Sequence, residues 1–172
     1  MRLVLTNDFE TVRKKYIEVI ENTPEIEHHA RWAYGKHPND ESLQSYIDRG
    51  EMFILKDGED IAGVTVLTME QGEDYENIPW QENLQNDQVA TVRLLAVCPA
   101  YRGRSLGMKI LKEAMEIAVR NGKKAFRLDT LKSNLPAQKM YERAEFSCRG
   151  ERRMYAENTG MTDFLYYEKP LV

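Results

Sequence analysis

The chain has 172 residues, of which 42% are hydrophobic and 30% are charged. A chain of this length and composition fits one ordinary domain with a substantial core, which excludes a disordered segment or a disulfide-stapled miniprotein. Its 24 lysines and arginines against 28 aspartates and glutamates leave a net charge of -4, with no general attraction for a polyanion or an acidic membrane. We therefore predict no nucleic-acid partner and no membrane partner.

Nothing in the sequence is typical of a secreted, membrane-bound or multidomain protein. No apolar run reaches the length of a transmembrane helix, Met1–Thr6 lacks the regions of a secretory signal, and no repeat or flexible linker divides the chain. The two cysteines, Cys98 and Cys148, lie far apart without a C-x-x-C partner, which favours reduced thiols over a disulfide or a zinc site. We predict a cytoplasmic protein with a single domain over residues 1–172.

The first half of the chain predicts a strand, two helices and a β-hairpin. Apolar residues recur every three or four positions in the helices, Asn39 caps the second helix, and Asp57-Gly58 makes the tight turn of the hairpin. The elements are a strand at Met1–Leu5, helices at Phe9–Glu21 and Asn39–Gly50, and a hairpin of Met52–Leu55 with Ile61–Thr68. The segment Glu70–Asn86 is polar and has neither a helical nor a strand period, so we interpret it as a functional loop.

The second half predicts a βαβ unit, a short helix and a closing pair of strands. Because a long amphipathic helix separates the first two strands, these strands must be parallel and joined by a right-handed crossover. The elements are a strand at Val89–Val97, a helix from about Leu106 to Asn121-Gly122, a strand at Ala125–Thr130, a helix from Ser133-Asn134 to about Arg143, and the pair Phe146–Met154 and Phe164–Lys169 around Asn158-Thr159-Gly160. The predicted fold class is α/β of the α+β type, with a mixed, mostly antiparallel sheet of six or seven strands and a central parallel pair.

The basic, glycine-containing turn Pro99–Met108 leaves a buried strand and opens a helix, as an anion-binding site does. Unpaired N–H groups of the first helical turn, the positive end of the helix dipole, and Arg102 with Arg104 all favour a phosphate there. The alternative is that Gly103 only turns the chain and the arginines are solvated. Neither G-x-x-x-x-G-K-[ST] nor G-x-G-x-x-G is present, which disfavours a nucleoside triphosphate or NAD.

Two motifs resemble those of the GNAT N-acetyltransferase superfamily. Arg102-Gly103-Arg104-Ser105-Leu106-Gly107 is similar to its acetyl-CoA motif R/Q-x-x-G-x-G/A, and Asn134-x-x-Ala137-x-x-Met140-Tyr141-Glu142 is similar to a second family motif. Ser105 departs from the usual glycine, and Ala144-Glu145-Phe146 stands where many members have Gly-Phe. Serine keeps its backbone N–H, so phosphate binding is retained unless the position requires a positive φ.

The resemblance implies the GNAT acyltransferase fold, in which the central parallel strands splay apart at a bulge and the pantetheine arm of acetyl-CoA enters the gap. Acetyl-CoA is then the co-substrate, and no metal is expected. The implied contacts are the backbones of Leu95 and Val97, the cradle segment Arg102, Gly103, Arg104, Ser105, Leu106, Gly107 and Met108, and the side chain of Asn134. Asn134 is equally well explained as a helix cap, and both roles are compatible.

Acyl transfer to an amine needs a neutral amine, donors for the developing oxyanion and a proton for the departing thiolate. Its place in the second motif implies that Tyr141 is the general acid, and a tyrosine with a pKa of about 10 stays protonated at neutral pH. The alternative is a half-buried core tyrosine. The resemblance places the oxyanion donor at a main-chain N–H near Leu95.

The general base is open, because Val89–Val92 contains no carboxylate where some family members have a glutamate. The candidates are a water chain and the loop residues Glu70, Glu73, Asp74 and Glu76. The aromatic residues Trp32, Tyr34, Tyr75 and Trp80 line an acceptor pocket or only pack at its rim. His28, His29 and His37 lack the spacing of a metal site, and Cys98 is best explained as a small residue at a strand end.

The sequence therefore predicts an N-acetyltransferase that moves the acetyl group of acetyl-CoA to a primary amine of a small molecule or peptide by direct attack. The alternative is a non-catalytic acyl-CoA-binding sensor or interaction module, which the missing strand carboxylate motivates. The resemblance also implies a possible homodimer.

Overall fold

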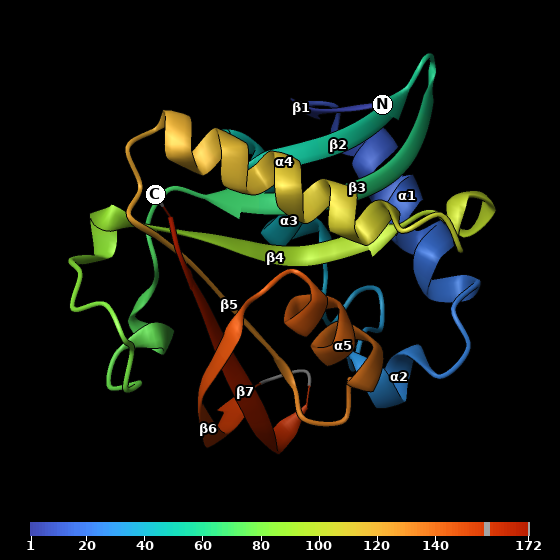
Figure 1. Cartoon of the computed structure of the whole chain (residues 1–172). Coiled ribbons are helices and arrows are strands. Elements are labelled where there is room, and N and C mark those ends of the chain that lie inside the picture. Colours follow the sequence, from blue (N-terminus) through green and yellow to red (C-terminus); the bar gives the residue numbers. More distant parts are fainter. Residues whose placement is uncertain (157–158, 172) are drawn as a thin grey trace.

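The computed structural model of the chain describes residues 1–156 and 159–171. Its strands form one sheet in the order β1-β2-β3-β4-β5-β7-β6, with helices on both faces (Figure 1). The strands are β1 (Arg2–Leu5), β2 (Met52–Asp57), β3 (Asp60–Thr68), β4 (Val89–Val97), β5 (Ala125–Leu131), β6 (Ser147–Ala156) and β7 (Gly160–Pro170). The α-helices are α1 (Phe9–Glu21), α2 (Ile26–His29), α3 (Asp40–Asp48), α4 (Leu106–Arg120) and α5 (Leu135–Arg143). Short 3-10 turns are η1 (Glu73–Tyr75), η2 (Asn86–Gln88) and η3 (Pro99–Tyr101).

The pairing of the strands confirms the predicted fold class. β4 and β5 pair in parallel, and the other neighbouring strands of the described sheet pair antiparallel. α4 makes the crossover between the parallel strands, as the sequence predicts. The sheet thus has seven strands and a central parallel pair.

Helices cover the two faces of the sheet in separate layers, with α4 in front of β2–β4 and with α1 and α3 behind them in Figure 1. Ile110 of α4 and Tyr141 of α5 belong to the hydrophobic cluster of one face. Val12 of α1 and Leu43 of α3 belong to the cluster of the other face. The amphipathic period of each helix therefore matches its place on the sheet.

Half-way along strand β4, the alternation of its side chains between the two faces of the sheet is interrupted. Val92 packs in the cluster under α4, whereas Leu94 packs in the cluster under α1 and α3, and Leu95 packs back toward α4. An uninterrupted strand would keep residues 92 and 94 on one face, because side chains alternate along it. Leu94 has a positive φ of 51°, and the register with β3 shifts here, so β4 contains a β-bulge at this point.

The described structure differs from the predicted elements mainly in its short pieces. α2 is absent from the prediction, because it spans only residues 26–29 and has no side-chain cap. The segment Glu70–Asn86 contains the turn η1 and enters η2, and η3 intervenes before α4. The closing strands extend beyond the predicted bounds on both sides of their turn, of which Asn158 lies outside the described residues.

Within residues 1–156 and 159–171, no helix has the length and apolar character needed to cross a bilayer.

Candidate active site

The two central strands separate soon after they begin. β4 and β5 pair only through Val89–Ala125, Ala90–Phe126 and Thr91–Arg127, and a cavity of about 420 Å³ is lined by residues of both strands beyond that point. The backbone at the opening is held by side chains of other elements. Tyr16 of α1 donates to the carbonyl of Leu94 at 2.8 Å, and Thr65 of β3 donates to the carbonyl of Arg93 at 3.2 Å. The bulge is thereby fixed by buried polar contacts.

The first turn of α4 exposes a row of unpaired donors. The backbone N–H groups from Gly103 to Met108 have no hydrogen-bond acceptor in the described part of the chain, and Ser105 makes no side-chain cap. The positive end of the helix dipole coincides with these N–H groups, so the segment is a ready-made site for a phosphate or diphosphate. We call residues 103–108 the N–H cradle.

The basic side chains near the cradle have partners within the protein. The Arg102 guanidinium donates to the carbonyl of Asn22 at 2.6 Å and to Thr23 Oγ1. The Arg104 guanidinium lies 5.3 Å from the centre of the Tyr101 ring. These partners are neutral, so both guanidinium groups keep their positive charge beside the backbone donors of the cradle.

Two cradle positions have left-handed backbone. Gly103 has a φ of 76°, which glycine adopts without penalty, and Ser105 has a φ of 55°. Ser105 thus stands where the chain requires a positive φ. At such a position the replacement of the family glycine by serine has an energetic cost. Its N–H remains unpaired, but the conformation costs a non-glycine residue about 1 kcal/mol.

Gly107 lies where α4 approaches α5. A Cβ built on Gly107 would sit 2.6 Å from Met140 Sδ and 3.9 Å from Leu95 Cδ2. Met140 and Leu95 both line the cavity. The absence of a side chain at Gly107 therefore lets the cradle adjoin the cavity.

Tyr141 lies against the cavity from α5. The side chain is buried, its ring lies 5.5 Å from that of Tyr167, and burial followed by the nearby negative charge of Asp129 raises the pKa of its hydroxyl well above 10. Both causes favour the neutral phenol. Tyr141 is therefore a protonated hydroxyl at a cavity wall across the range of physiological pH.

The remaining predicted cofactor residues differ in their relation to the cavity. Leu95 and Asn134 line it, whereas Val97 pairs with Gly63 of β3 and lies outside its lining. Asn134 caps α5, because its Oδ1 accepts from the N–H of Ala137 at 3.2 Å. The cap interpretation of Asn134 is therefore confirmed, and its place at the cavity leaves its amide group close to any ligand there.

A second group of polar residues lines the same cavity from the opposite side of the sheet. Asp129 of β5 accepts a hydrogen bond from Tyr75 at 2.6 Å, and Arg93 of β4 donates to both carboxylate oxygens of Asp74, at 3.1 and 2.9 Å. Burial raises the pKa of Asp129 and lowers the pKa of His37, which also lines the cavity. Both groups are thus shifted toward their neutral forms.

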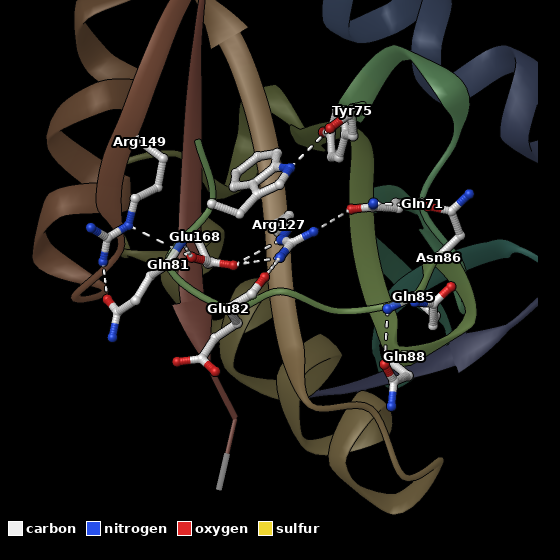
Figure 2. A network of polar contacts seen from close by, with 11 residues as sticks. Gln71, Tyr75, Gln81, Glu82, Gln85, Asn86, Gln88, Arg127, Arg149 and Glu168 are labelled. Carbon is white, nitrogen blue, oxygen red and sulfur yellow. Dashed lines mark hydrogen bonds and ion pairs between the residues drawn. The ribbon is translucent and has the colours of Figure 1, made fainter. Parts of the chain in front are cut away.

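The loop that carries Asp74 and Tyr75 is fastened to the sheet by a buried ion pair (Figure 2). Arg127 of β5 donates from Nε to Glu168 of β7 at 2.8 Å, and both side chains are almost fully buried. The same guanidinium donates to Gln71 at 2.8 Å and to the carbonyl of Glu82 at 2.5 Å, so it binds both ends of the loop. The loop is therefore anchored below the residues that face the cavity.

The aromatic residues singled out in the sequence have different positions. Some of them lie at the cavity, and others lie away from it or at the Arg127–Glu168 ion pair that anchors the loop. Trp32 lines the cavity, and Tyr75 reaches it through Asp129. Trp80 instead stacks on Arg127, 4.3 Å from the guanidinium carbon to the ring centre, and Tyr34 donates to Asp40 away from the cavity. Trp80 and Tyr34 are therefore not part of the cavity lining.

The other candidates of the sequence have limited roles here. Among the four loop acids, Asp74 lines the cavity, and Glu70, Glu73 and Glu76 are not in its lining. Cys98 is buried at the end of β4, burial raises the pKa of its thiol, and it is outside the cavity lining. Within the described residues, no group of three or more histidines, cysteines, aspartates or glutamates is arranged to hold a metal ion.

Sequence reasoning did not single out Asp129, Arg93 or the cavity role of His37. One pattern pointed to the first two: Asp129 and Arg93 are charged residues in the mostly apolar strands Ala125–Leu131 and Val89–Val97, although the same pattern also marks Arg127. A charge in a buried strand is rare unless it is paired or functional. Their convergence depends on the splay of the strands.

The family model described as the acetyltransferase (GNAT) family matches residues 17–146, which is more than half of the chain. The chain therefore belongs to this family. No curated protein matches the sequence.

Solved structures with the same fold come from several bacteria. A GNAT-family acetyltransferase from Listeria monocytogenes is 18% identical with a TM-score of 0.72, and the match covers 98% of this chain and 94% of that chain. The yncA protein of Salmonella typhimurium, solved with its cofactor acetyl-CoA, is 14% identical with a TM-score of 0.70 and coverages of 100% and 94%. The ribosomal-protein-S18-alanine N-acetyltransferase from Escherichia coli is 19% identical with a TM-score of 0.65 and coverages of 98% and 92%. These similarities show the fold.

Proposed function

We propose that the chain transfers the acetyl group of acetyl-CoA to a primary amine by direct attack, with Tyr141 as the general acid. The observation that carries this proposal is the cavity in the splay, which brings the bulge of β4 and Tyr141 of the second motif to one space. Membership of the acetyltransferase (GNAT) family supports the reaction class. Acetyl-CoA in the Salmonella typhimurium structure and CoA in a Bacillus subtilis acetyltransferase of similar fold support the co-substrate.

The N–H cradle and the cavity fit the two ends of acetyl-CoA. In the proposed complex the N–H groups of residues 103–108 donate to the diphosphate, and the backbones of Leu95 and Val97 with the amide of Asn134 bind the arm. Acetyl-CoA supplies an acetyl group that is already activated as a thioester. The chain then has to orient the acceptor, stabilise the developing oxyanion at the bulge near Leu95, and return a proton to sulfur.

The environment of Tyr141 supports its role as the proton donor. A thiol has a pKa near 8.5, so a phenol with a raised pKa stays protonated until a thiolate is present nearby. The hydroxyl group of Tyr141 has no hydrogen-bond partner in the described part of the chain, so its proton is free for a ligand. Tyr141 therefore holds its proton at the cavity wall and gives it to the departing sulfur.

Direct attack is favoured because neither Cys98 nor Cys148 lines the cavity. Cys98 is buried, the pKa of its thiol is raised, and it lies outside the cavity lining. A nucleophilic cysteine instead needs a lowered pKa and access to substrate. No acetylated cysteine is therefore required, and Cys98→Ala retains transfer in this proposal.

The experiment is a thiol-release assay with acetyl-CoA and a panel of primary amines, on the wild type and on Tyr141→Phe. We expect the variant to lower kcat by about 100-fold and to leave the dissociation constant of acetyl-CoA within about twofold, because loss of a general acid affects chemistry rather than binding. Tyr34→Phe, which changes a tyrosine away from the cavity, is the control. Equal turnover in Tyr141→Phe and the wild type would remove Tyr141 from the mechanism.

The same assay separates the enzyme from a non-catalytic acyl-CoA-binding module. Binding of CoA without turnover on any amine would support the module. The acceptor class, small molecule or peptide, is read from the panel. A single domain over residues 1–172, a cytoplasmic location and a homodimer stay predictions, and sedimentation tests the last of these.

A further inference from the structure

The cavity has an end that the proposed function leaves unassigned. On the side of α4 and α5, the proposed function assigns roles to the bulge, Asn134 and Tyr141. On the side of the loop 70–88, the cavity is lined by Asp129 and Arg93, which have no assigned role. Leu128 packs in the cluster under α4, and Asp129, the next residue of β5, points to the opposite face of the sheet. The cavity therefore passes through the gap between β4 and β5.

One carboxylate at this end has an oxygen available to a ligand. Asp129 Oδ1 accepts from Tyr75 at 2.6 Å, and Oδ2 has no hydrogen-bond donor in residues 1–156 and 159–171. Asp74, by contrast, has both oxygens occupied by Arg93. Asp129 is only partly buried and lines the cavity, so Oδ2 is open to a ligand there. A ligand with a charged or neutral N–H group in the cavity would complete the site at Asp129.

The charges that face Asp129 make this end of the cavity negative. They are Arg93 from β4, Asp74 and Tyr75 from the loop, His37 from the segment before α3, Tyr141 from α5 and Tyr166 from β7. Asp74 balances Arg93, and burial keeps His37 in its neutral form. When Asp129 is ionised, the net charge of this end is that of its carboxylate, and the cavity then favours a cation over an anion or a zwitterion.

Several other residues of the lining are apolar or aromatic. They are Trp32, Tyr46, Met154, Phe164 and Tyr166. The volume of about 420 Å³ is shared with the acyl-bearing arm, which leaves room for a small acceptor only. Aromatic side chains around Asp129, the one lining carboxylate that is not paired with Arg93, suit an ammonium group on an apolar body.

We propose that Asp129 is a catalytic residue that binds the ammonium group of the acceptor and accepts its proton, and that the acceptor is a small, apolar amine without a carboxylate. This proposal rests on the proposed function. The site supplies the carboxylate that β4 itself lacks. It also selects between the acceptors left open above, in favour of a small molecule.

The proton balance of the step is complete within the cavity. One ammonium N–H bond breaks as an O–H bond forms on Asp129, and this proton then leaves to solvent. The neutral nitrogen bonds to the acetyl carbon as the carbon–sulfur bond breaks. Tyr141 gives its proton to the departing sulfur. The nitrogen then loses a second proton, and this proton replaces the one that Tyr141 gave up. No further reactant is needed.

The first test compares Asp129→Asn with the wild type in the thiol-release assay, using phenethylamine and phenylalanine as acceptors. We expect the wild type to acetylate phenethylamine with a kcat/KM at least tenfold above that for phenylalanine, and we expect Asp129→Asn to lose at least 100-fold in kcat for phenethylamine. Asp163→Asn, a surface carboxylate of β7 that pairs with Arg153, is the matched control and should match the wild type.

The second test uses Tyr75→Phe, which removes the hydrogen bond that lowers the pKa of Asp129. A protonated Asp129 cannot accept a proton, so activity falls as the pH drops below the pKa of Asp129. This acid limb of the pH–activity profile should move to higher pH in Tyr75→Phe. A role that is only structural would lower activity equally at every pH.

Full activity in Asp129→Asn, preference for phenylalanine, or an unmoved acid limb would overturn the assignment of Asp129. Failure of the wild type to bind acetyl-CoA or to acetylate any amine is a different result, which would overturn the proposed function itself.

Discussion

Tyr141 and Asp129 face one cavity from opposite sides of the sheet, and burial moves both pKa values upward. For a phenol the shift keeps a proton in place, and for a carboxylate it strengthens a weak base. The proposed roles of Tyr141 as acid and Asp129 as base require this division. The same shifts have consequences for stability that are measurable without a substrate.

Asp129→Asn should stabilise the protein at pH 8. The pKa of Asp129 is higher in the folded than in the unfolded state, so its contribution to stability is fully present below the unfolded value and is lost as pH rises through the folded value. Asparagine removes this cost and still accepts a hydrogen bond from Tyr75. Thermal unfolding at pH 8 should give a higher Tm for the variant, and the difference should shrink as the pH is lowered toward 4. A lower Tm at pH 8 would show that the carboxylate stabilises the fold.

Ser105→Gly should increase stability by about 0.5–1 kcal/mol, because glycine adopts a φ of 55° without the steric cost that serine carries. No capping hydrogen bond is lost, since the Ser105 side chain makes none. Ser105→Ala retains the strained φ and is the control, with no gain expected. Urea unfolding measures both, and an equal change in the two variants would contradict the strain argument.

At the scale of elements, the site depends on two devices that separate its walls. The bulge of β4 moves Leu95 to the side of α4, and the splay beyond Thr91 opens the sheet. The anchor formed by Arg127 and Glu168 holds the loop on the other side through Gln71 and Glu82 (Figure 2). The bulge, the separation of β4 and β5 and these buried polar contacts together fix the end of the cavity that we propose for the acceptor.

Arg127→Met should destabilise the protein by about 3 kcal/mol, because it leaves the Glu168 carboxylate buried without its main partner. The loop also loses its contacts at Gln71 and Glu82. Lys132→Met, which removes a solvent-exposed pair with Glu151, is the matched control and should cost less than 1 kcal/mol. Chemical denaturation compares the two, and similar small losses would show that the anchor contributes little.

At the scale of the whole molecule, the order of strands and helices followed from sequence patterns, because periodicity, caps and turns are local properties. The crossover between Val89–Val97 and Ala125–Leu131 also followed, since a helix of that length permits only a parallel pair. The N–H cradle could be predicted for the same reason, because the end of a strand, a glycine and the start of a helix follow one another in the sequence.

The acceptor end of the site could not be predicted in the same way. Asp129, Arg93 and His37 come from three separate segments, and only the splay and the bulge bring them to one cavity. The hydrogen-bond partners of Arg102 also could not be predicted, because Asn22 and Thr23 lie far from it in the sequence. Local patterns predict elements, whereas convergence across the sheet depends on tertiary geometry.

The whole account depends on a diphosphate at the N–H cradle, and Gly107→Glu tests this by placing bulk and negative charge beside it. A Cβ at this position points toward Met140 and Leu95, so the carboxylate enters the junction of cradle and cavity. We expect the dissociation constant of CoA to rise at least tenfold. Gly107→Ala controls for bulk alone and should have a smaller effect, because only Met140 has to move.

The most direct measurement is isothermal titration calorimetry of the wild type with CoA and with pantetheine, which has the same arm without the diphosphate. We predict saturable binding of CoA and binding of pantetheine that is at least 100-fold weaker. Absence of binding heat with CoA, or equal affinity for the two compounds, would contradict this prediction.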